Sequence, residues 1–536
     1  MSHRILVLDA FAGEGLQLLR SDPALQVDES APLPEKELAA IVGPYEALIV
    51  RSQSKITAPV LEAASALRAV GRAGTGVDNV DLKEATRRGV VVMNAPAGNS
   101  VAAAEHAFGL MLALARNIPG ANASLRAGQW ERKAFTGVEL EGKVLGICGL
   151  GRIGREVARR AAAFRMKILA YDPYVTSEGA ADTGAEMVPF ETLMENADFV
   201  TLHLPMSPET RGLVSKERLA RSKRGIRIVN AARGGLIDEA ALLEALDSGQ
   251  VAGAALDVFE TEPPTGSPLL QHPRVVSTPH LGASTKEAQT RVGIEIAAKI
   301  RDYLKSGEIR DAVNVPAIPA SELAKLSPYI TLVQRLGALL AQITPGATRE
   351  LAITYEGEAS RLDTRPLTMA AVQGALGPVL DIPVGFVNAL VLAKERKVRV
   401  VDTKGGEDGQ YTSRIEIRMV SEGGEHRAAG TVFQGKEPRI VGIDGITVEA
   451  APDGLYLFIT NRDIPGVIGE IGSVLGARGV NIASMNLGRD RASGRALALV
   501  GVDSTVDAGT LDLLSQRPGI ESVKLVSFTD DRRPIS

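Results

Sequence analysis

Three side chains of the 536-residue chain have the chemistry to move a proton beside a bound carboxylate. Histidine is suited to reversible proton transfer near neutral pH, and His280 stands between Pro279 and Gly282 at the predicted end of a strand. Glu262, eighteen residues earlier, can orient the imidazole and stabilise the imidazolium, and Arg233 offers a bidentate fork to a carboxylate. A structural His–Glu pair is the alternative, and the strand-end position of His280 favours catalysis. The set predicts proton transfer at the hydroxyl of a carboxylate-bearing substrate.

Residues 143–172 predict a strand, a glycine-rich turn, a helix and a second strand. Gly149, Gly151 and Gly154 have the G-x-G-x-x-G spacing of a turn that lets a pyrophosphate approach the N-terminus of the following helix. The second strand ends on Asp172, which can accept hydrogen bonds from the adenosine-ribose hydroxyls, and no arginine follows to hold a 2′-phosphate. A purely structural glycine turn is the alternative, and the flanking elements favour dinucleotide binding. The sequence therefore predicts NAD rather than NADP, and a hydride transfer.

Length and composition limit the elements that can position these residues. At 536 residues the chain predicts three or four domains. A net charge of -4 and a pI near 6.0 give no electrostatic reason to expect nucleic acid or membrane partners, and no pattern predicts a metal site. The single cysteine, Cys148, lies in a predicted strand, where a small buried hydrophobe is the favoured interpretation. Because the sequence shows neither a signal peptide nor eighteen consecutive apolar residues, we expect a soluble, cytoplasmic protein.

The N-terminal region predicts a second parallel sheet, with strands at 5–8, 47–50, 69–70 and 90–93 and helices between them. Arg51 and Ser52 follow one of these strands, residues 72–76 (RAGTG) follow another, and residues 94–96 follow a third. Ligands of open parallel sheets bind at the carboxyl ends of the strands. A solvated loop position is the alternative for Arg51, but the pattern predicts that this sheet forms one wall of the site.

The order of the elements predicts the domains. A long helix at 98–117 leads into the nucleotide-binding sheet, and the helix at 285–304 returns the chain to the first one. We therefore expect an α/β fold with two doubly wound parallel sheets: a Rossmann NAD-binding domain (98–284) inserted in a flavodoxin-like substrate-binding domain (1–97 and 285–312). After a proline-marked linker, residues 320–450 predict an α+β domain, and residues 453–530 predict a ferredoxin-like βαββαβ domain.

Five blocks carry a resemblance to a known family: VGRAGTGVDNVDL, GICGLGRIGREVA, VNAARGGLIDEAAL, AGAALDVFETEPP and TPHLGASTKEAQ. They resemble the D-isomer-specific 2-hydroxyacid dehydrogenases, and within them the long-form phosphoglycerate dehydrogenases. The similarity covers the first 310 residues. It continues in residues 320–450, which resemble the intervening domain of the long form, and in residues 453–530, which resemble its ACT domain.

The resemblance implies roles for individual residues. His280 is implied as the acid/base, Glu262 as its partner and Arg233 as the ligand of the substrate carboxylate. Arg132 and Lys133 are implied to reach the site of a neighbouring subunit in a homo-oligomer, a tetramer by resemblance. The implied cofactor contacts, together with the glycine turn, are Thr75, Gly149, Gly151, Arg152, Ile153, Gly154, Asp172, His203, Leu204 (through its backbone), Pro205, Ala231, Ala232, Asp257, Gly282 and Ala283. The implied substrate contacts are Arg51, Ser52, Gly74, Asn99 and Ser100.

The implied function is NAD-dependent oxidation of 3-phospho-D-glycerate to 3-phosphohydroxypyruvate, the first step of L-serine biosynthesis. Two alternatives stay open. One is another D-2-hydroxyacid dehydrogenase, acting on hydroxypyruvate, glyoxylate or 2-hydroxyglutarate, and the other is an NAD-sensing binding protein on the same fold.

L-serine is a further expected ligand, as an effector bound by the C-terminal domain. Asp463 precedes a Pro-Gly turn before a helix, and Asn481 opens the next strand. An acid, an amide and a helix N-terminus could together hold the ammonium and carboxylate of an amino acid. In the alternative interpretation Asp463 only caps the helix and the domain only holds subunits together.

Overall fold

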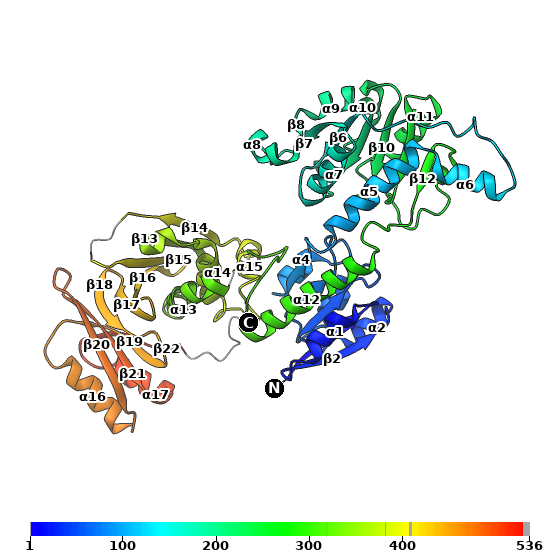
Figure 1. Ribbon diagram of the computed structural model, residues 1–536. Coiled ribbons are helices and arrows are strands. Elements are labelled where there is room, and N and C mark those ends of the chain that lie inside the picture. The colour runs from blue at the N-terminus through cyan, green and yellow to red at the C-terminus, as the bar shows by residue number, and fades with distance from the viewer. Residues whose placement is uncertain (1, 317, 319, 381, 407–409, 529–536) are drawn as a thin grey trace.

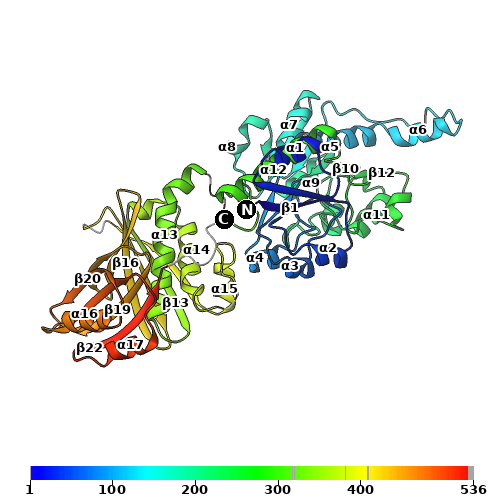
Figure 2. The same cartoon turned by 90° about the horizontal axis from the view of Figure 1, so that it is seen from below.

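The chain forms four β-sheets, each with its own helices (Figure 1). The structure is a computed structural model, and it describes residues 2–316, 318, 320–380, 382–406 and 410–528. The two parallel sheets lie in the blue-to-green half, and the two largely antiparallel sheets lie in the yellow-to-red half. Figure 2 shows the same separation from below. This arrangement confirms the predicted fold class.

The first parallel sheet has the order β2-β1-β3-β4-β5. Because side chains alternate along a strand, Ile5 and Val7 pack toward the cluster that contains Ile296, while Leu6 pairs with the cluster on the opposite face. The sequence does not predict β2, because this half-exposed edge strand (LQVDES) has no apolar run. The elements are β1 (His3–Leu8), α1 (Gly13–Arg20), β2 (Leu25–Ser30), α2 (Glu35–Ile41), β3 (Ala47–Val50), α3 (Ala58–Ala63), β4 (Ala69–Arg72), α4 (Leu82–Arg87), β5 (Val91–Asn94) and α12 (Lys286–Ser306).

The second parallel sheet has the order β12-β11-β10-β9-β6-β7-β8. The chain moves outward from β6 first through β7 and β8 and then through β9 in the other direction, so the crevice for a ligand lies at the carboxyl ends of β6 and β9. Its strands are β6 (Val144–Cys148), β7 (Lys167–Tyr171), β8 (Glu186–Met187), β9 (Phe199–Leu202), β10 (Ile226–Asn230), β11 (Val251–Leu256) and β12 (Val275–Ser277). Its helices include α7 (Arg152–Ala163), α9 (Phe190–Asn196), α10 (Lys216–Arg221) and α11 (Glu239–Asp247).

Two helices connect the lobes that carry these sheets. They are α5 (Ser100–Ala115) and α12 (Figure 1). The prediction of one helix over 98–117 is wrong at its end, because Asn117 adopts a left-handed backbone conformation (φ 53°) and α6 (Ile118–Arg126) starts anew. Helix α6 projects away from the body in Figure 2, and the chain after it exposes 77% of Trp130.

The other two sheets follow the predicted α+β and βαββαβ orders. The six-stranded sheet is β14-β13-β15-β16-β17-β18, covered by α13 (Ala320–Ile343) and α14 (Thr364–Leu376). Its strands are β13 (Thr348–Gly357), β14 (Arg399–Lys404), β15 (Ser413–Ser421), β16 (Gly424–Phe433), β17 (Glu437–Ile443) and β18 (Ile446–Ala450), with α15 (Ala389–Glu395) before β14. The C-terminal sheet is β20-β21-β19-β22, built from β19 (Leu455–Arg462), α16 (Val467–Ala477), β20 (Ile482–Asp490), β21 (Arg495–Val502), α17 (Ala508–Ser515) and β22 (Ile520–Ser527).

The C-terminal half is tied to the first lobe by hydrogen bonds. Residues 312–314 run along the outer edge of β5, where Val313 N–H donates to Val92 O (2.9 Å) and Val92 N–H donates to Asn314 Oδ1 (2.9 Å). Buried Asn388 donates from Nδ2 to Arg87 O (3.0 Å) at the end of α4. The linker therefore extends the first sheet. No helix among the described residues has the length and apolar character needed to cross a membrane.

Candidate active site

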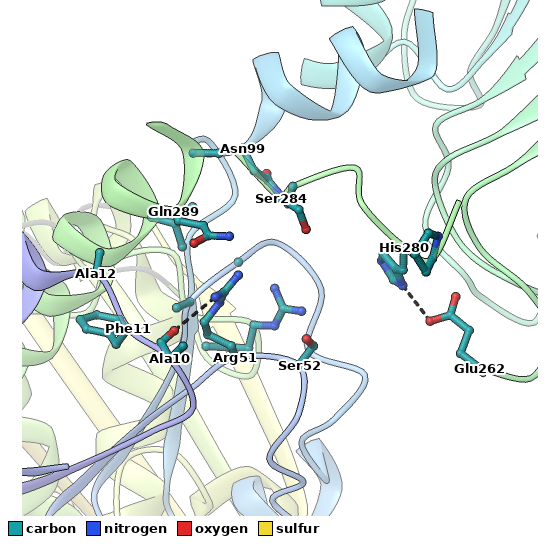
Figure 3. Close-up of a pocket in the computed structure, with 17 residues that line it drawn as sticks. Ala10, Phe11, Ala12, Arg51, Ser52, Asn99, Glu262, His280, Ser284 and Gln289 are labelled. Atoms are coloured by element: carbon teal, nitrogen blue, oxygen red, sulfur yellow. Dashed lines mark hydrogen bonds and ion pairs between the residues drawn. The ribbon is translucent and has the colours of Figure 1, made fainter. Parts of the chain in front are cut away.

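His280 and Glu262 form a hydrogen-bonded pair in the cleft between the two parallel sheets. Glu262 Oε2 lies 2.7 Å from His280 Nδ1, and Oε1 accepts the N–H of Phe259 at 3.2 Å (Figure 3). Because a carboxylate only accepts, Nδ1 must donate, which leaves Nε2 as the basic nitrogen. His280 follows β12 and has a left-handed backbone (φ 54°). The structure thus brings together two of the three residues predicted for catalysis.

A cavity of about 320 Å³ separates this pair from the carboxyl ends of the first sheet. Figure 3 shows Arg51 and Ser52 on the wall opposite His280. Gly74, Asn99 and Ala283 also line it. The cavity therefore contains four of the predicted substrate residues, and the strand-end argument placed them at the correct edge.

Arg72 is a lining residue that the sequence argument left without a role. It ends β4, and its Nε is buried without a hydrogen-bond partner in the described part of the chain. Burial, together with repulsion from Arg233 and Arg51, lowers the pKa of Arg72 to about 10. Its Nη1 lies beneath Gly74, 1.6 Å from where a Cβ of residue 74 would stand. A second guanidinium thus adds positive charge beside Arg51, and its place at the end of a strand was the available signal.

Arg233 reaches from the second sheet to the first. It follows β10, and its Nη1 donates to Ala232 O (2.7 Å) while Nε lies 3.1 Å from Oδ2 of Asp78. Its Nη2 lies 1.9 Å from where a Cβ of Gly76 would stand, so only glycine accommodates the guanidinium there. Arg233 is near the cavity, and Asp78 rather than a ligand pairs with it.

The glycine turn after β6 has the geometry that a dinucleotide requires. Gly149 has φ 97°, and a Cβ at Gly154 would stand 2.1 Å from Gly149 O, so packing requires these two glycines. A Cβ at Gly151 would meet no atom within 4 Å, so the space over this residue is open for a pyrophosphate. Helix α7 begins there without a side-chain cap. Asp172 accepts the N–H of Leu150 at 2.8 Å, which holds its carboxylate beside the turn. These residues fit NAD.

Comparison with known proteins identifies the family. Residues 108–282 match the NAD-binding domain of D-isomer specific 2-hydroxyacid dehydrogenases, residues 325–444 the D-3-phosphoglycerate dehydrogenase intervening domain, and residues 455–519 the ACT domain. A D-3-phosphoglycerate dehydrogenase of Synechocystis is 42% identical over 98% of this chain and 95% of its own, and one of Bacillus subtilis is 41% identical over 98% and 99%. The chain belongs to the D-3-phosphoglycerate dehydrogenase family.

Solved structures agree for the catalytic half. A glyoxylate reductase from Paecilomyes thermophila is 32% identical, with a TM-score of 0.54, and covers 58% of this chain and 98% of its own. D-lactate dehydrogenase from Escherichia coli is 29% identical, with a TM-score of 0.52, over 58% and 99%. This phosphoglycerate dehydrogenase family member is an NAD-dependent oxidoreductase that acts on a CH–OH group.

In this family member, Asp257 holds the His280 loop. Its buried carboxylate accepts the N–H groups of Leu281 (2.7 Å) and Gly282 (2.9 Å) and the hydroxyl of Thr278 (2.6 Å), and it lies 3.1 Å from His106 Nε2. Burial by itself raises the pKa of Asp257, but the hydrogen bonds from His106, Thr278 and Leu281 outweigh it and lower the pKa. A contact of Asp257 with NAD stays a prediction, because the partners seen in the structure are protein groups.

The remaining predicted cofactor residues lie near the turn. Thr75 donates to Asn99 Oδ1 (2.7 Å), joining two cleft residues. His203 is bonded to Thr201 (3.0 Å), and burial lowers the pKa of His203 to about 4, so its ring is neutral. Leu204 is buried beside Gly149. The direct contacts of Arg152, Ile153, Pro205, Ala231, Ala232 and Ala283 with NAD stay predictions.

Three predicted substrate residues do not line the cavity. Ser100 is buried, and its hydroxyl faces Pro96 O at 3.4 Å. Arg132 and Lys133 are exposed in the segment that follows α6. Their own chain therefore does not bring this pair of cations to its cavity.

The two predicted regulatory residues have partners within the C-terminal domain. Asp463 makes a bidentate ion pair with Arg489 (2.8 and 3.0 Å), and Asn481 Nδ2 donates to Asp503 (2.5 Å). The alternative in which Asp463 caps α16 is not seen, because Gly466 is the N-cap and no side chain caps it. An amino acid at Asp463 would have to displace Arg489.

Proposed function

We propose that this chain oxidises 3-phospho-D-glycerate to 3-phosphohydroxypyruvate with NAD, the first step of L-serine biosynthesis. The observation that carries the proposal is the cavity in which the His280–Glu262 pair faces Arg51 and Arg72. A base opposite paired guanidinium groups suits a hydroxy acid that bears a phosphate. The relatives at 42% and 41% identity are named for the same substrate.

The proton path follows from the geometry of the pair. NAD, when bound, supplies the hydride acceptor for C2 of the substrate. His280 Nε2 takes the proton of the C2 hydroxyl as the carbonyl forms, and Glu262 stabilises the resulting imidazolium from 2.7 Å away. The substrate thereby loses a hydride and a proton. Half of the His280 side chain is exposed, so the ring can pass the proton to water.

Positive charge assigns the two anionic ends of the substrate. We assign its carboxylate to Arg233, whose planar fork suits bidentate binding, and its phosphate to Arg51 and Arg72. Ser52 and Asn99 line the same cavity and can add hydrogen bonds. Support for Arg72 comes from its buried, unpartnered Nε within the described residues.

A neighbouring subunit completes the phosphate site in this proposal. Arg132 and Lys133 follow the projecting helix α6, beside a largely exposed Trp130 that suits an interface. We propose a homotetramer in the cytoplasm, in which these two cations reach the cavity of the adjacent chain.

The proposed domains keep the predicted bounds: 1–97 with 285–312, 98–284, 320–450 and 453–530. In the last domain, L-serine is proposed to slow catalysis by binding at Asp463 and Asn481. The ACT match supports regulation by a small molecule.

A panel of 2-hydroxy and 2-oxo acids, followed by NADH absorbance, tests the proposed reaction. It should contain 3-phosphoglycerate, glycerate, lactate and 2-hydroxyglutarate, with 3-phosphohydroxypyruvate, hydroxypyruvate and glyoxylate for the reverse direction. We expect kcat/KM for the phosphorylated substrates to exceed that for the others by about 10²-fold or more, because losing a bound charged group leaves buried partners unpaired. Equal values for hydroxypyruvate and its phosphate would contradict the proposal.

A further inference from the structure

We propose that Asp9 and Asn79 are positioning residues that clamp the anion loop, residues 51–54 (RSQS), and thereby set the preference for a phosphorylated substrate. The inference rests on the proposed function, because it concerns how Arg51 is aimed at the phosphate. Asp9 follows β1, the anion loop follows β3, and Asn79 lies in the loop after β4. Three adjacent strand ends therefore contribute to one arrangement.

Asp9 holds the N–H side of the anion loop. Its Oδ2 accepts the N–H groups of Arg51 (2.7 Å) and Ser54 (3.2 Å), and its Oδ1 accepts the hydroxyl of Ser54 (2.5 Å). Asp9 is 8% exposed and Ser54 is 1% exposed, so water competes little for these bonds. The carboxylate thus fixes both ends of the tetrapeptide.

Asn79 holds the carbonyl side of the same loop. Its Nδ2 donates to the carbonyl oxygens of Arg51 (2.6 Å) and Ser54 (2.7 Å). The main-chain N–H and C=O groups of both residues are therefore all bonded, from opposite sides, by two side chains. Only the side chains of the loop are left to address the cavity.

The turn that carries Asp9 also holds the tip of Arg51. Arg51 Nη1 donates to the carbonyl of Ala10, the next residue, at 3.2 Å (Figure 3). Asp9 adopts a left-handed backbone (φ 67°), which is costly for a residue other than glycine. A strained turn with a buried charge that grips both the backbone and the guanidinium of one cavity residue indicates a positioning role for substrate binding.

A role limited to stability predicts a different result. Loss of general stability would lower the denaturation temperature and leave the ratio of KM values for phosphorylated and unphosphorylated substrates unchanged. Misplacement of Arg51 would change that ratio, because hydroxypyruvate has no phosphate for Arg51 to bind. The ratio therefore separates the two roles.

The test uses the full chain in the reductive direction, with NADH and either 3-phosphohydroxypyruvate or hydroxypyruvate. In Asp9→Ala and in Asn79→Asp, which turns two donors into a repelling carboxylate, we expect KM for the phosphorylated substrate to rise about tenfold or more relative to hydroxypyruvate. Asp9→Asn should restore the ratio to within about threefold of wild type, because a turned amide can accept both N–H groups and donate to Ser54. Asp28→Ala is the matched control, since Asp28 bonds Arg4 and Tyr45 (both 2.9 Å) in the same lobe outside the cavity.

Several outcomes would overturn the clamp. Parallel changes in both KM values, or an Asp9→Asn variant as impaired as Asp9→Ala, would leave no role for the geometry of the loop. NADH binding followed by fluorescence identifies a variant that fails to fold, and the other variants then decide. A wild-type enzyme without preference for the phosphorylated substrate would instead refute the proposed function, whatever the variants do.

Discussion

Arg233 Nε lies 3.1 Å from Oδ2 of Asp78, so one ion pair joins the carboxyl ends of the two parallel sheets. Arg233 follows β10 in the NAD-binding sheet, and Asp78 follows β4 in the other. The side chain of Asp78 is 73% exposed, so water screens the pair and the carboxylate can be exchanged readily. Asp78 occupies the position at Arg233 that we assign to the carboxylate of the substrate.

Removing this competing carboxylate is expected to favour substrate binding. In Asp78→Asn, KM for the hydroxy acid should fall about two- to fivefold with little change in kcat, because exposed ion pairs contribute roughly 0–1 kcal/mol. Steady-state kinetics with saturating NAD measure this. A rise in KM would show instead that Asp78 orients Arg233 for the substrate. Asp81→Ala, which removes the N-cap of α4 two turns of chain away from the pair, serves as the control.

Loss of the base should act mainly on the chemical step. His280→Ala should lower kcat by about 10²- to 10⁴-fold while NADH binding stays nearly unchanged. Glu262→Gln should cost less. Because Glu262 lies 2.7 Å from Nδ1 and favours the imidazolium, its loss should move the acid limb of the kcat/KM profile for oxidation to lower pH. A profile identical to that of the parent would exclude Glu262 from the mechanism.

The contribution of a neighbouring subunit is testable through the phosphate. Neutralising Arg132 and Lys133 together should raise KM for 3-phosphohydroxypyruvate by about tenfold or more, and should change KM for hydroxypyruvate little, because only the former carries the charge that they would bind. Equal effects on both substrates would mean that the pair does not contact the phosphate. Arg165, a half-turn residue paired with Glu141 on the surface, provides a neutralisation control.

Asp257 should stabilise the fold in a pH-dependent way. Its pKa is lowered in the folded state, so its contribution is fully present above the unfolded pKa of about 4 and is lost as pH falls through the folded value. Asp257→Asn keeps the shape but loses the charge, and at pH 7 it should reduce stability by roughly 2–4 kcal/mol. The difference in denaturation temperature from wild type, followed by circular dichroism, should shrink below about pH 4. A difference that is independent of pH would contradict an ionised Asp257.

Serine sensing should depend on Arg489 as well as on Asp463, because the two form a bidentate ion pair. Millimolar L-serine should inhibit the wild type, Asp463→Ala should abolish the inhibition, and Arg489→Ala should strengthen it by freeing the carboxylate. Uninhibited activity should be preserved in both variants, since both residues lie in the C-terminal domain. A wild type that does not respond to L-serine would exclude this effector.

The sequence by itself predicted the fold class, the NAD-binding turn and the identity of the proton-transfer pair. These predictions succeed because their chemistry depends on local spacing. The G-x-G-x-x-G turn, the acid at the end of the next strand and the histidine at a strand end each lie within one short segment of the chain. The family blocks lie in the same segments.

Only the tertiary structure decided which side chains face one another across the cleft. Arg72, the Asp9–Asn79 clamp and the Arg233–Asp78 pair each combine residues from the ends of different strands. Asp463 and Arg489 likewise come from separate strand ends. Such contacts depend on strand order and on the angle between the lobes, which no local pattern encodes. The physical reason is that hydrogen bonds and ion pairs act over about 3 Å, whereas the residues that form these contacts lie up to 155 positions apart along the chain.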